Sequence, residues 1–260
     1  MIWNHISLAA AEDVALVTLR RPEVRNALSG MAMIEELICA LEEVEASGAG
    51  ALVLTGEGKA FSAGGNVKDM AAREGLFAPM SAGQVLDVYR SGVQRLLSKL
   101  YRCEVVTIAA VNGAAVGAGL DLALACDLRY CAPDAVFSAP FVSIGLVPGD
   151  GGIPLLAEAV GRQRAAELLF TGRRWDAGEA RRYGVVLDVV HADELLEHAM
   201  AVARDVAAKP RQALHLTKRL LRLAVTEQPA AVSELSAAFQ AIAQTGQEHQ
   251  AAAERLPRRG

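Results

Sequence analysis

Short apolar runs alternate along most of the chain with segments whose apolar positions recur every three or four residues. The apolar runs predict strands at residues 14–19, 51–55, 105–111, 128–131, 136–137 and 185–190. The helical periodicity predicts helices at residues 29–46 (capped by Ser29), 67–72, 82–101, 118–125, 155–160 and 162–170. Strands that alternate with helices are typical of the α/β class.

The pattern changes near residue 192, after which the chain is helical throughout, with breaks at Pro210 and Pro229. We therefore predict a core over residues 1–192 that carries the functional site, and a helical lobe over residues 193–260. Apolar stripes run along this lobe, formed by Leu216, Leu220, Leu223, Leu235, Phe239 and Ile242. They either pack within the lobe or bury against further copies of the chain, and the second reading predicts a homo-oligomer.

Composition narrows the possible functions. Hydrophobic residues make up 52% of the 260 residues but aromatic residues only 5%, so Ala, Val and Leu must build most of the core. The net charge of −4 argues against nucleic acid as the main partner. We find no long uninterrupted apolar run and no leader-like segment, so we expect no membrane span and a cytoplasmic location. The four cysteines (Cys39, Cys103, Cys126 and Cys131) lack metal-site spacing, so we expect no metal.

Two glycine-rich turns are the strongest chemical signal. Residues 61–66 (FSAGGN) and 117–121 (GAGLD) each follow an apolar, strand-like run. Small residues between a strand and a helix expose backbone N–H groups that no side chain screens. If the turns face each other, they form a pair of donors for a developing oxyanion. The alternative is that both are tight turns needed only for packing.

The second turn is not a dinucleotide-binding motif. The third glycine of GxGxxG is replaced by Leu122, and no acidic residue ends a second strand about twenty positions later. We therefore expect no nucleotide cofactor.

The two turns, together with three further segments, resemble the signatures of the crotonase (enoyl-CoA hydratase/isomerase) superfamily. The matching segments are 21–29 (RPEVRNALS), 61–70 (FSAGGNVKDM), 112–123 (NGAAVGAGLDLA), 144–152 (IGLVPGDGG) and 170–172 (FTG). The resemblance covers nearly the whole chain, in order and at family spacing. It implies a spiral core of repeated ββα units, with a C-terminal helical lobe that forms trimers, often paired into hexamers.

The resemblance also implies an acyl-CoA substrate and no separate cofactor, because coenzyme A is part of the substrate. The thioester carbonyl would lie between the N–H groups of Gly65 and Ala118, the family's two oxyanion-hole positions. Coenzyme A contacts are implied for Val24, Arg25, Ala63, Asn66, Val67 and Lys68. For each of these an ordinary solvated or structural role is an equal alternative. The stretch 71–89 is expected to border the acyl pocket.

The acid/base positions depart from the family pattern, in which hydratases use two glutamates. The first position is Asp121, and the second is Phe141, which transfers no proton and is expected in the acyl pocket. Asp150 is a second candidate for proton transfer; alternatively it caps the following helix. The resemblance favours hydration of a 2-enoyl-CoA through an enolate. Isomerisation of an enoyl-CoA by a single carboxylate, or acyl-CoA binding without catalysis, are the alternatives.

Overall fold

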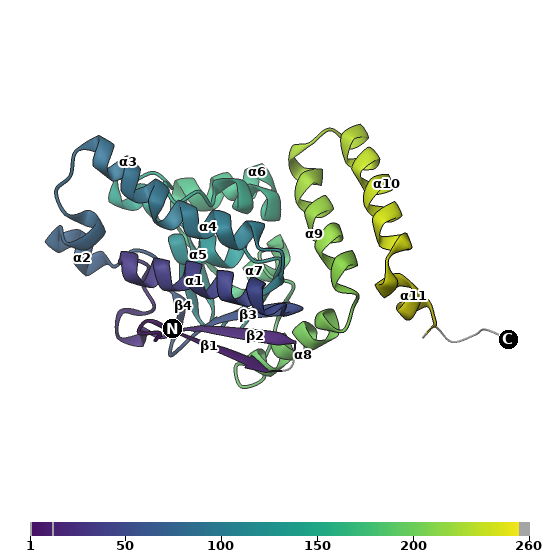
Figure 1. Ribbon diagram of the computed structural model, residues 1–260. Coiled ribbons are helices and arrows are strands. Elements are labelled where there is room, and N and C mark those ends of the chain that lie inside the picture. The colour runs from purple at the N-terminus through teal and green to yellow at the C-terminus, as the bar shows by residue number, and fades with distance from the viewer. Residues whose placement is uncertain (1, 12, 255–260) are drawn as a thin grey trace.

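The computed structural model describes residues 2–11 and 13–254, whose strands form two sheets (Figure 1). The larger sheet has six strands, in the order β1 (Ile6–Ala11), β2 (Val14–Leu19), β3 (Ala51–Gly56), β5 (Val106–Val111), β7 (Leu128–Cys131) and β10 (Asp188–Val189). The smaller sheet has four strands, in the order β4 (Ala60–Ser62), β6 (Ala114–Val116), β8 (Val136–Ser138) and β9 (Arg174–Asp176). All pairs are parallel except β1 with β2 and β8 with β9.

A unit of two strands and a helical segment repeats along the core. In each unit the first strand joins the larger sheet and the second joins the smaller one: β3 then β4, β5 then β6, and β7 then β8. The helices that follow are α2 (Val67–Ala72), α3 (Ala82–Ser91) and α4 (Val93–Arg102), then α5 (Ala118–Leu124), then α6 (Ile153–Thr171). Because successive strands alternate between the sheets, the chain winds as a spiral. The predicted α/β fold of repeated ββα units is confirmed.

Helices cover both faces of the larger sheet, and β3 is buried along its whole length. Leu52 and Leu54 pack in the cluster that contains α1 (Met31–Ser47) and α4. The alternate residues Ala51 and Val53 pack instead with α8 (Leu195–Ala207). Successive side chains of a strand point to opposite faces, so a continuous apolar run is what a strand between two helical layers requires.

The predicted helix over residues 82–101 is broken in two. Gly92 lies between α3 and α4 with φ −96° and ψ −110°, which is not helical. A Cβ built on Gly92 would lie 2.7 Å from the Val88 carbonyl oxygen, so the bend depends on glycine. The apolar residues Val93, Leu96, Leu97 and Leu100 of α4 are buried, whereas Val85 on α3 is 38% exposed. Because of this bend, α4 packs against the core, whereas α3 has no buried residue.

Other boundaries also differ from the predictions. Helix α1 begins at Met31 and has Gly30 at its N-cap without a side-chain cap, so the predicted cap by Ser29 is wrong. The Ser29 hydroxyl instead accepts a hydrogen bond from the Asn66 backbone N–H at 2.5 Å. The last core strand is limited to β10, and the strands β1, β4, β6 and β9 were not predicted. In α6, Gly161 is non-helical, as expected for the two helices predicted there.

The C-terminal helices stand beside the core (Figure 1). They are α9 (Arg211–Thr226), α10 (Pro229–Thr245) and α11 (Gln247–Glu254), and the breaks predicted at Pro210 and Pro229 are present. In the described part of this lobe, Lys218 is the buried residue of α9, while α10 and α11 have none. The apolar stripes predicted there are therefore partly or largely exposed within one chain. None of the helices in the described ranges combines the length and apolar character needed to cross a membrane.

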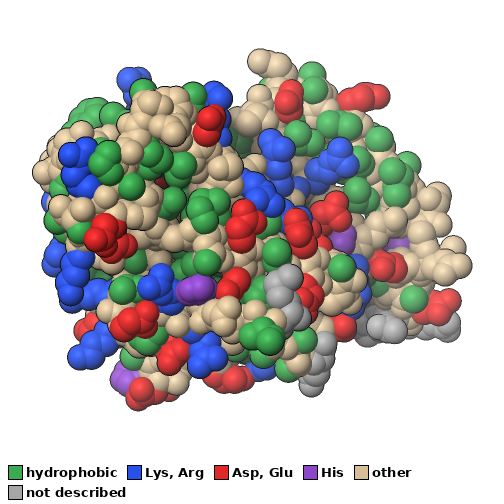
Figure 2. Space-filling model, turned by 60° about the vertical axis from the view of Figure 1, so that its left-hand side comes forward, with side chains coloured by type: hydrophobic (Ala, Val, Ile, Leu, Met, Phe, Trp, Pro, Cys, Tyr) green, Lys and Arg blue, Asp and Glu red, His purple; other side chains and the backbone are tan. Residues whose placement is uncertain are grey.

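Charges of both signs mix on the surface. On the face drawn in Figure 2, Lys and Arg side chains are interspersed with Asp and Glu, with hydrophobic side chains between them. This face therefore presents no continuous basic surface of the kind that binds nucleic acid.

Candidate active site

The two glycine-rich turns lie against each other because β4 and β6, the strands that lead into them, are paired. A Cβ built on Gly64, which has φ +70°, would lie 2.3 Å from the Val116 carbonyl oxygen and 2.9 Å from the Ala118 nitrogen. A Cβ built on Gly119 would lie 2.1 Å from the Ser62 carbonyl oxygen. Contacts this close are possible only between backbones, so both glycines are required for the turns to meet. The sequence-based expectation that the turns face each other agrees with this geometry.

The N–H groups of Gly65 and Ala118 belong to residues that line the same cavity. Ala118 is the first residue of α5 and follows Gly117, whose φ is +53°. In the part of the chain that the structure describes, neither N–H donates a hydrogen bond to a protein acceptor. Backbone N–H groups inside proteins are nearly always paired, so two free ones at one cavity are available for a ligand.

The cavity has a volume of about 140 Å³ and lies between the turns, helices α2 to α4 and the loop after β8. Its walls are mostly apolar and include Met70 on α2, Phe77 on η2 (Gly75–Phe77), Tyr89 on α3 and Phe141 on η3 (Phe141–Ile144). Asp150 is the ionisable carboxyl group in the wall. An apolar cavity with a few convergent polar groups is typical of a small-molecule site.

The two candidate proton-transfer residues occupy different positions. Asp150 lines the cavity, whereas Asp121 is not among the described residues that line it. Asp121 lies against Gly152, where a built Cβ would be 1.9 Å from the carboxyl carbon. Its Oδ2 is buried and has no hydrogen-bond partner among the described residues. The order of preference predicted from the sequence, Asp121 before Asp150, therefore does not match their access to the cavity.

Burial raises the pKa of both carboxyl groups. For Asp150, which is 6% exposed, loss of solvation raises the pKa to about 6. For Asp121, which is 5% exposed, burial and then the neighbouring charge of Asp150 raise the pKa well above its usual value. In both residues burial therefore favours the protonated carboxyl group. Carboxyl groups with pKa values raised by burial beside a cavity are typical of acid/base sites.

Helices α3 and α4 hold the loop that carries Asp150. The Gln94 side-chain N–H donates a hydrogen bond of 2.7 Å to the Gly149 carbonyl oxygen. A Cβ built on Gly149 would lie 3.2 Å from Cε1 of Tyr89, so the phenol ring packs against the residue before Asp150. Burial and the charge of Asp150 raise the pKa of Tyr89. Both side chains therefore help to fix the position of the Asp150 carboxyl group.

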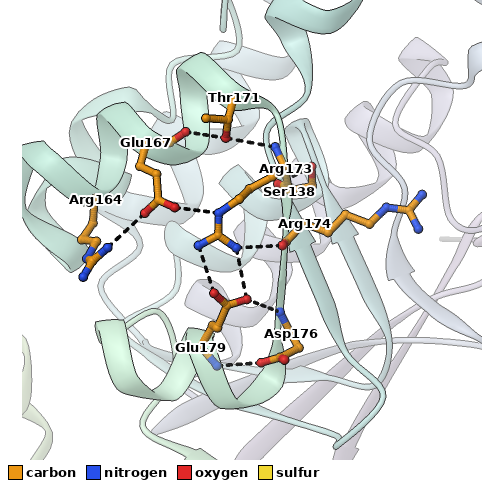
Figure 3. Close-up of polar contacts among 8 residues, drawn as sticks. All are labelled: Ser138, Arg164, Glu167, Thr171, Arg173, Arg174, Asp176 and Glu179. Atoms are coloured by element: carbon orange, nitrogen blue, oxygen red, sulfur yellow. Dashed lines mark hydrogen bonds and ion pairs between the residues drawn. The ribbon is translucent and has the colours of Figure 1, made fainter.

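A second group of contacts surrounds Arg173, which follows α6 (Figure 3). The Gly117 N–H donates to the Ser138 carbonyl oxygen at 2.9 Å, and the Ser138 hydroxyl donates to the Gly172 and Arg173 carbonyl oxygens. Arg173 in turn bridges Glu167 on α6 and Glu179 on α7 (Ala177–Tyr183). Hydrogen bonds from Arg173 lower the pKa of Glu167. This network fixes β9 beside β8, the strand on which Gly117 is anchored.

The predicted coenzyme A residues fall into two groups. Ala63 and Val67 line the cavity, whereas Val24, Arg25, Asn66 and Lys68 are not among its described lining residues. Both backbone groups of Asn66 are already used, because its N–H donates to Ser29 and its carbonyl accepts from Met70. The Asn66 side chain caps α2. Arg25 and Lys68 are exposed near the turn.

Several residues of the site were not singled out from the sequence. Phe77 and Tyr89 come from the stretch 71–89, which was expected to border the acyl pocket without a named residue. Met70 ends the quoted segment 61–70 but was given no role, and Gln94 was not singled out. The sequence did not predict the bend at Gly92. This bend orients α3 and α4 differently and brings residues of both helices to the cavity.

Comparisons with known proteins show the family and the fold of the chain. The family model described as enoyl-CoA hydratase/isomerase matches residues 9–256. The chain is 36% identical over 224 residues to a probable enoyl-CoA hydratase (echA8) of Mycobacterium bovis, covering 86% of this chain and 83% of the relative. It is 36% identical over 232 residues to a probable enoyl-CoA hydratase of Rhizobium meliloti, covering 87% and 86%. The crystal structure of an enoyl-CoA hydratase from Bacillus anthracis superposes with a TM-score of 0.87 at 30% identity, covering 95% of this chain and 93% of the other.

Proposed function

Because this chain belongs to the enoyl-CoA hydratase/isomerase family, we propose that it hydrates a 2-enoyl-CoA through an enolate that the Gly65 and Ala118 amides stabilise. The observation that carries the proposal is the pair of unpaired amides at one cavity, together with the Asp150 carboxyl group in its wall. The substrate is an acyl-CoA thioester, and no separate cofactor takes part.

The two amides supply the main stabilisation. Attack on the β carbon moves the electrons of the double bond onto the thioester oxygen, which becomes negatively charged. Two donors that point at this oxygen need no reorganisation during the reaction, and each is worth about 3 kcal/mol of barrier reduction. The apolar cavity walls strengthen this effect, because they keep water away from the charge.

Asp150 transfers the proton. As a carboxylate it accepts a proton from the water molecule whose oxygen bonds to the β carbon. As the resulting acid it gives that proton to the α carbon, which restores both the thioester carbonyl and the carboxylate. A pKa of about 6 suits both steps at neutral pH. The pKa of Asp121, which lies against Gly152, is also raised, by burial and by the charge of Asp150.

Double-bond isomerisation is the second candidate, and Phe141 is the observation that favours it. This apolar ring lines the cavity at the place where the family pattern has a second glutamate. Isomerisation needs a single carboxylate, because Asp150 would remove a proton from the α carbon of a 3-enoyl-CoA and return it to the γ carbon. No water molecule is consumed in that reaction.

Heavy water distinguishes the candidates. Incubation with a 2-enoyl-CoA should give a 3-hydroxyacyl-CoA with one deuterium on the α carbon and loss of absorbance from the conjugated thioester. If the chain is an isomerase, a 3-enoyl-CoA instead gains that absorbance and no hydroxyl group forms. If neither substrate changes while acyl-CoA still binds, the chain is a binding protein and the proposed function is wrong.

We also propose that the chain forms a homotrimer or a pair of trimers and works in the cytoplasm. The exposed apolar residues of α9 and α10, such as Leu221, Leu235 and Ile242, support an interface between copies. The four free cysteines fit a reducing compartment. Light scattering at micromolar concentration tests the assembly, and a monomeric mass would rule it out.

A further inference from the structure

Three aromatic rings lie around the two glycine-rich turns and the Asp150 loop. Each ring packs against a glycine of one of these segments. A Cβ built on Gly65 would lie 3.3 Å from Cζ of Phe77, and one built on Gly117 would lie 3.5 Å from Cζ of Phe141. The third ring is Tyr89, which packs against Gly149. The acyl group attached to the thioester carbonyl must therefore lie between these rings.

The walls beyond the rings are apolar. Leu76, Val88, Val93, Ile144 and Leu146 complete the part of the cavity away from the two turns. Among the described lining residues there is no Lys, Arg or His. An ionised group on the acyl chain would be buried here without a partner, which is strongly unfavourable. Asp150 would also repel a negative charge.

The volume limits the length of the acyl group. The cavity of about 140 Å³ includes the place of the thioester carbonyl, since the residues of both amides line it. A protein cavity of roughly 150 Å³ lined by Leu, Ile and Phe holds one benzene molecule, which has six carbon atoms. An acyl group of about six carbons therefore fills this space.

We propose that the substrate carries a compact, uncharged, apolar acyl group of about six carbon atoms, enclosed by Phe77, Tyr89 and Phe141. This inference rests on the proposed function for the position of the thioester. It goes further because it disfavours acyl groups with a terminal carboxylate and predicts that carbons beyond about the sixth gain little from burial.

The test compares kcat/KM for straight 2-enoyl-CoA thioesters of four, six and twelve carbons, and for the six-carbon thioester that ends in a carboxylate. We expect an increase of up to about fifteenfold from four to six carbons, since each buried methylene contributes about 0.8 kcal/mol. The twelve-carbon substrate should gain no more than about twofold over the six-carbon one, because its end extends past the covered volume, where Ile144 and Leu146 are partly exposed. The carboxylate should cost about a hundredfold or more. Activity that rises steadily to twelve carbons, or equal activity with the carboxylate, would overturn the proposal.

A variant tests the wall itself. Phe77→Ala enlarges the cavity and should move the preferred length to eight carbons or beyond, whereas Phe170→Ala should leave the preference unchanged. Phe170 is 77% exposed and is not among the described lining residues. If Phe77→Ala does not fold, Phe77→Leu should show a smaller shift in the same direction. An unchanged preference in a folded Phe77 variant contradicts the proposed wall.

Binding of saturated acyl-CoAs, measured by calorimetry, separates the two proposals. If no enoyl-CoA is converted but the affinity of saturated thioesters still levels off at about six carbons, the proposed reaction is wrong and the acyl class stands. If enoyl-CoAs are converted without preference for length or charge, the reaction stands and the acyl class is wrong.

Discussion

The cavity region and the C-terminal lobe both bury ionisable side chains, but they differ in whether the buried group is paired with one of opposite charge. Asp121 and Asp150 are enclosed without a cation, and burial raises the pKa of each. Lys218 on α9 is equally buried, but its ammonium group lies 2.6 Å from an Asp127 carboxylate oxygen and donates to the Val105 carbonyl oxygen at 2.7 Å. A buried charge with partners fixes structure, whereas one without partners costs stability and therefore indicates a function.

The partners of Lys218 show how the lobe is attached. Asp127 also accepts hydrogen bonds from the backbone N–H and the hydroxyl of Thr107. One turn further along α9, Arg222 donates to the Tyr101 and Cys103 carbonyl oxygens at the end of α4. Helix α9 is thus joined to the core by these polar contacts. The reacting groups and the lobe should therefore respond differently to substitution.

The largest effect is expected for Asp150→Asn. Without an ionisable group in the cavity wall, turnover should fall by about 10²–10⁴-fold. The free energy of unfolding should stay the same or rise, because the enclosed carboxylate is replaced by a neutral amide. Enzyme assays and urea unfolding measure the two quantities.

The matched control for Asp150→Asn is Asp134→Asn, since Asp134 is exposed and should change neither quantity. Retained turnover in the Asp150 variant would remove this residue from the mechanism and leave Asp121 as the candidate.

The opposite result is expected for Lys218→Met. Removal of one partner leaves Asp127 without its cation, so the free energy of unfolding should fall by about 3 kcal/mol. Turnover per folded molecule should be unchanged. Adding Asp127→Asn should recover part of the loss, because the remaining charge is then gone.

Lys209→Met, at an exposed position, is the control for Lys218→Met and should leave the free energy of unfolding within about 0.5 kcal/mol of the parent. A Lys218 variant as stable as this control would mean that the ion pair does not attach the lobe.

Activity and stability should depend on pH in opposite directions at Asp150. Asp150 must be ionised to accept a proton, so kcat/KM should fall about tenfold per pH unit below pH 6 or so. Stability should move the other way. The folded-state pKa of about 6 lies above the ordinary 3.8, so the folded chain binds this proton more tightly. The contribution of Asp150 to the free energy of unfolding therefore rises as pH falls through this window. A flat profile of kcat/KM between about pH 5 and 7 would contradict the assigned base.

The sequence predicted the backbone of the site better than its side chains. The turns that bear Gly65 and Ala118 were found because glycine patterns between strands and helices have few structural explanations. Which carboxyl group reaches the cavity was not predictable, because it depends on the contact of Asp121 with Gly152, 31 positions away. Lys218 gave no signal either, since a lysine on an amphipathic helix normally faces solvent.

The bend at Gly92 shows a similar limit. An apolar periodicity that continues across a glycine is compatible with one helix or with two, and only the packing against Val88 and the core decides. The same bend brings Tyr89 and Gln94 to the Asp150 loop. Residues that act through tertiary contacts of this kind leave no mark in the local pattern.

The smallest effect, and the most specific one, is expected at Gln94. Its hydrogen bond to the Gly149 carbonyl oxygen is worth about 1 kcal/mol, so Gln94→Ala should lower kcat about fivefold with a similarly small loss of stability. Ser98→Ala, at an exposed position on the same helix, is the control. Gln94→Glu distinguishes positioning of Asp150 from a purely structural role. The glutamate cannot donate the hydrogen bond, and it places a negative charge beside the loop that carries Asp150. The pKa of Asp150 should then rise, and the acid limb of the kcat/KM profile should move to higher pH. If that limb stays in place, Gln94 does not position the carboxyl group.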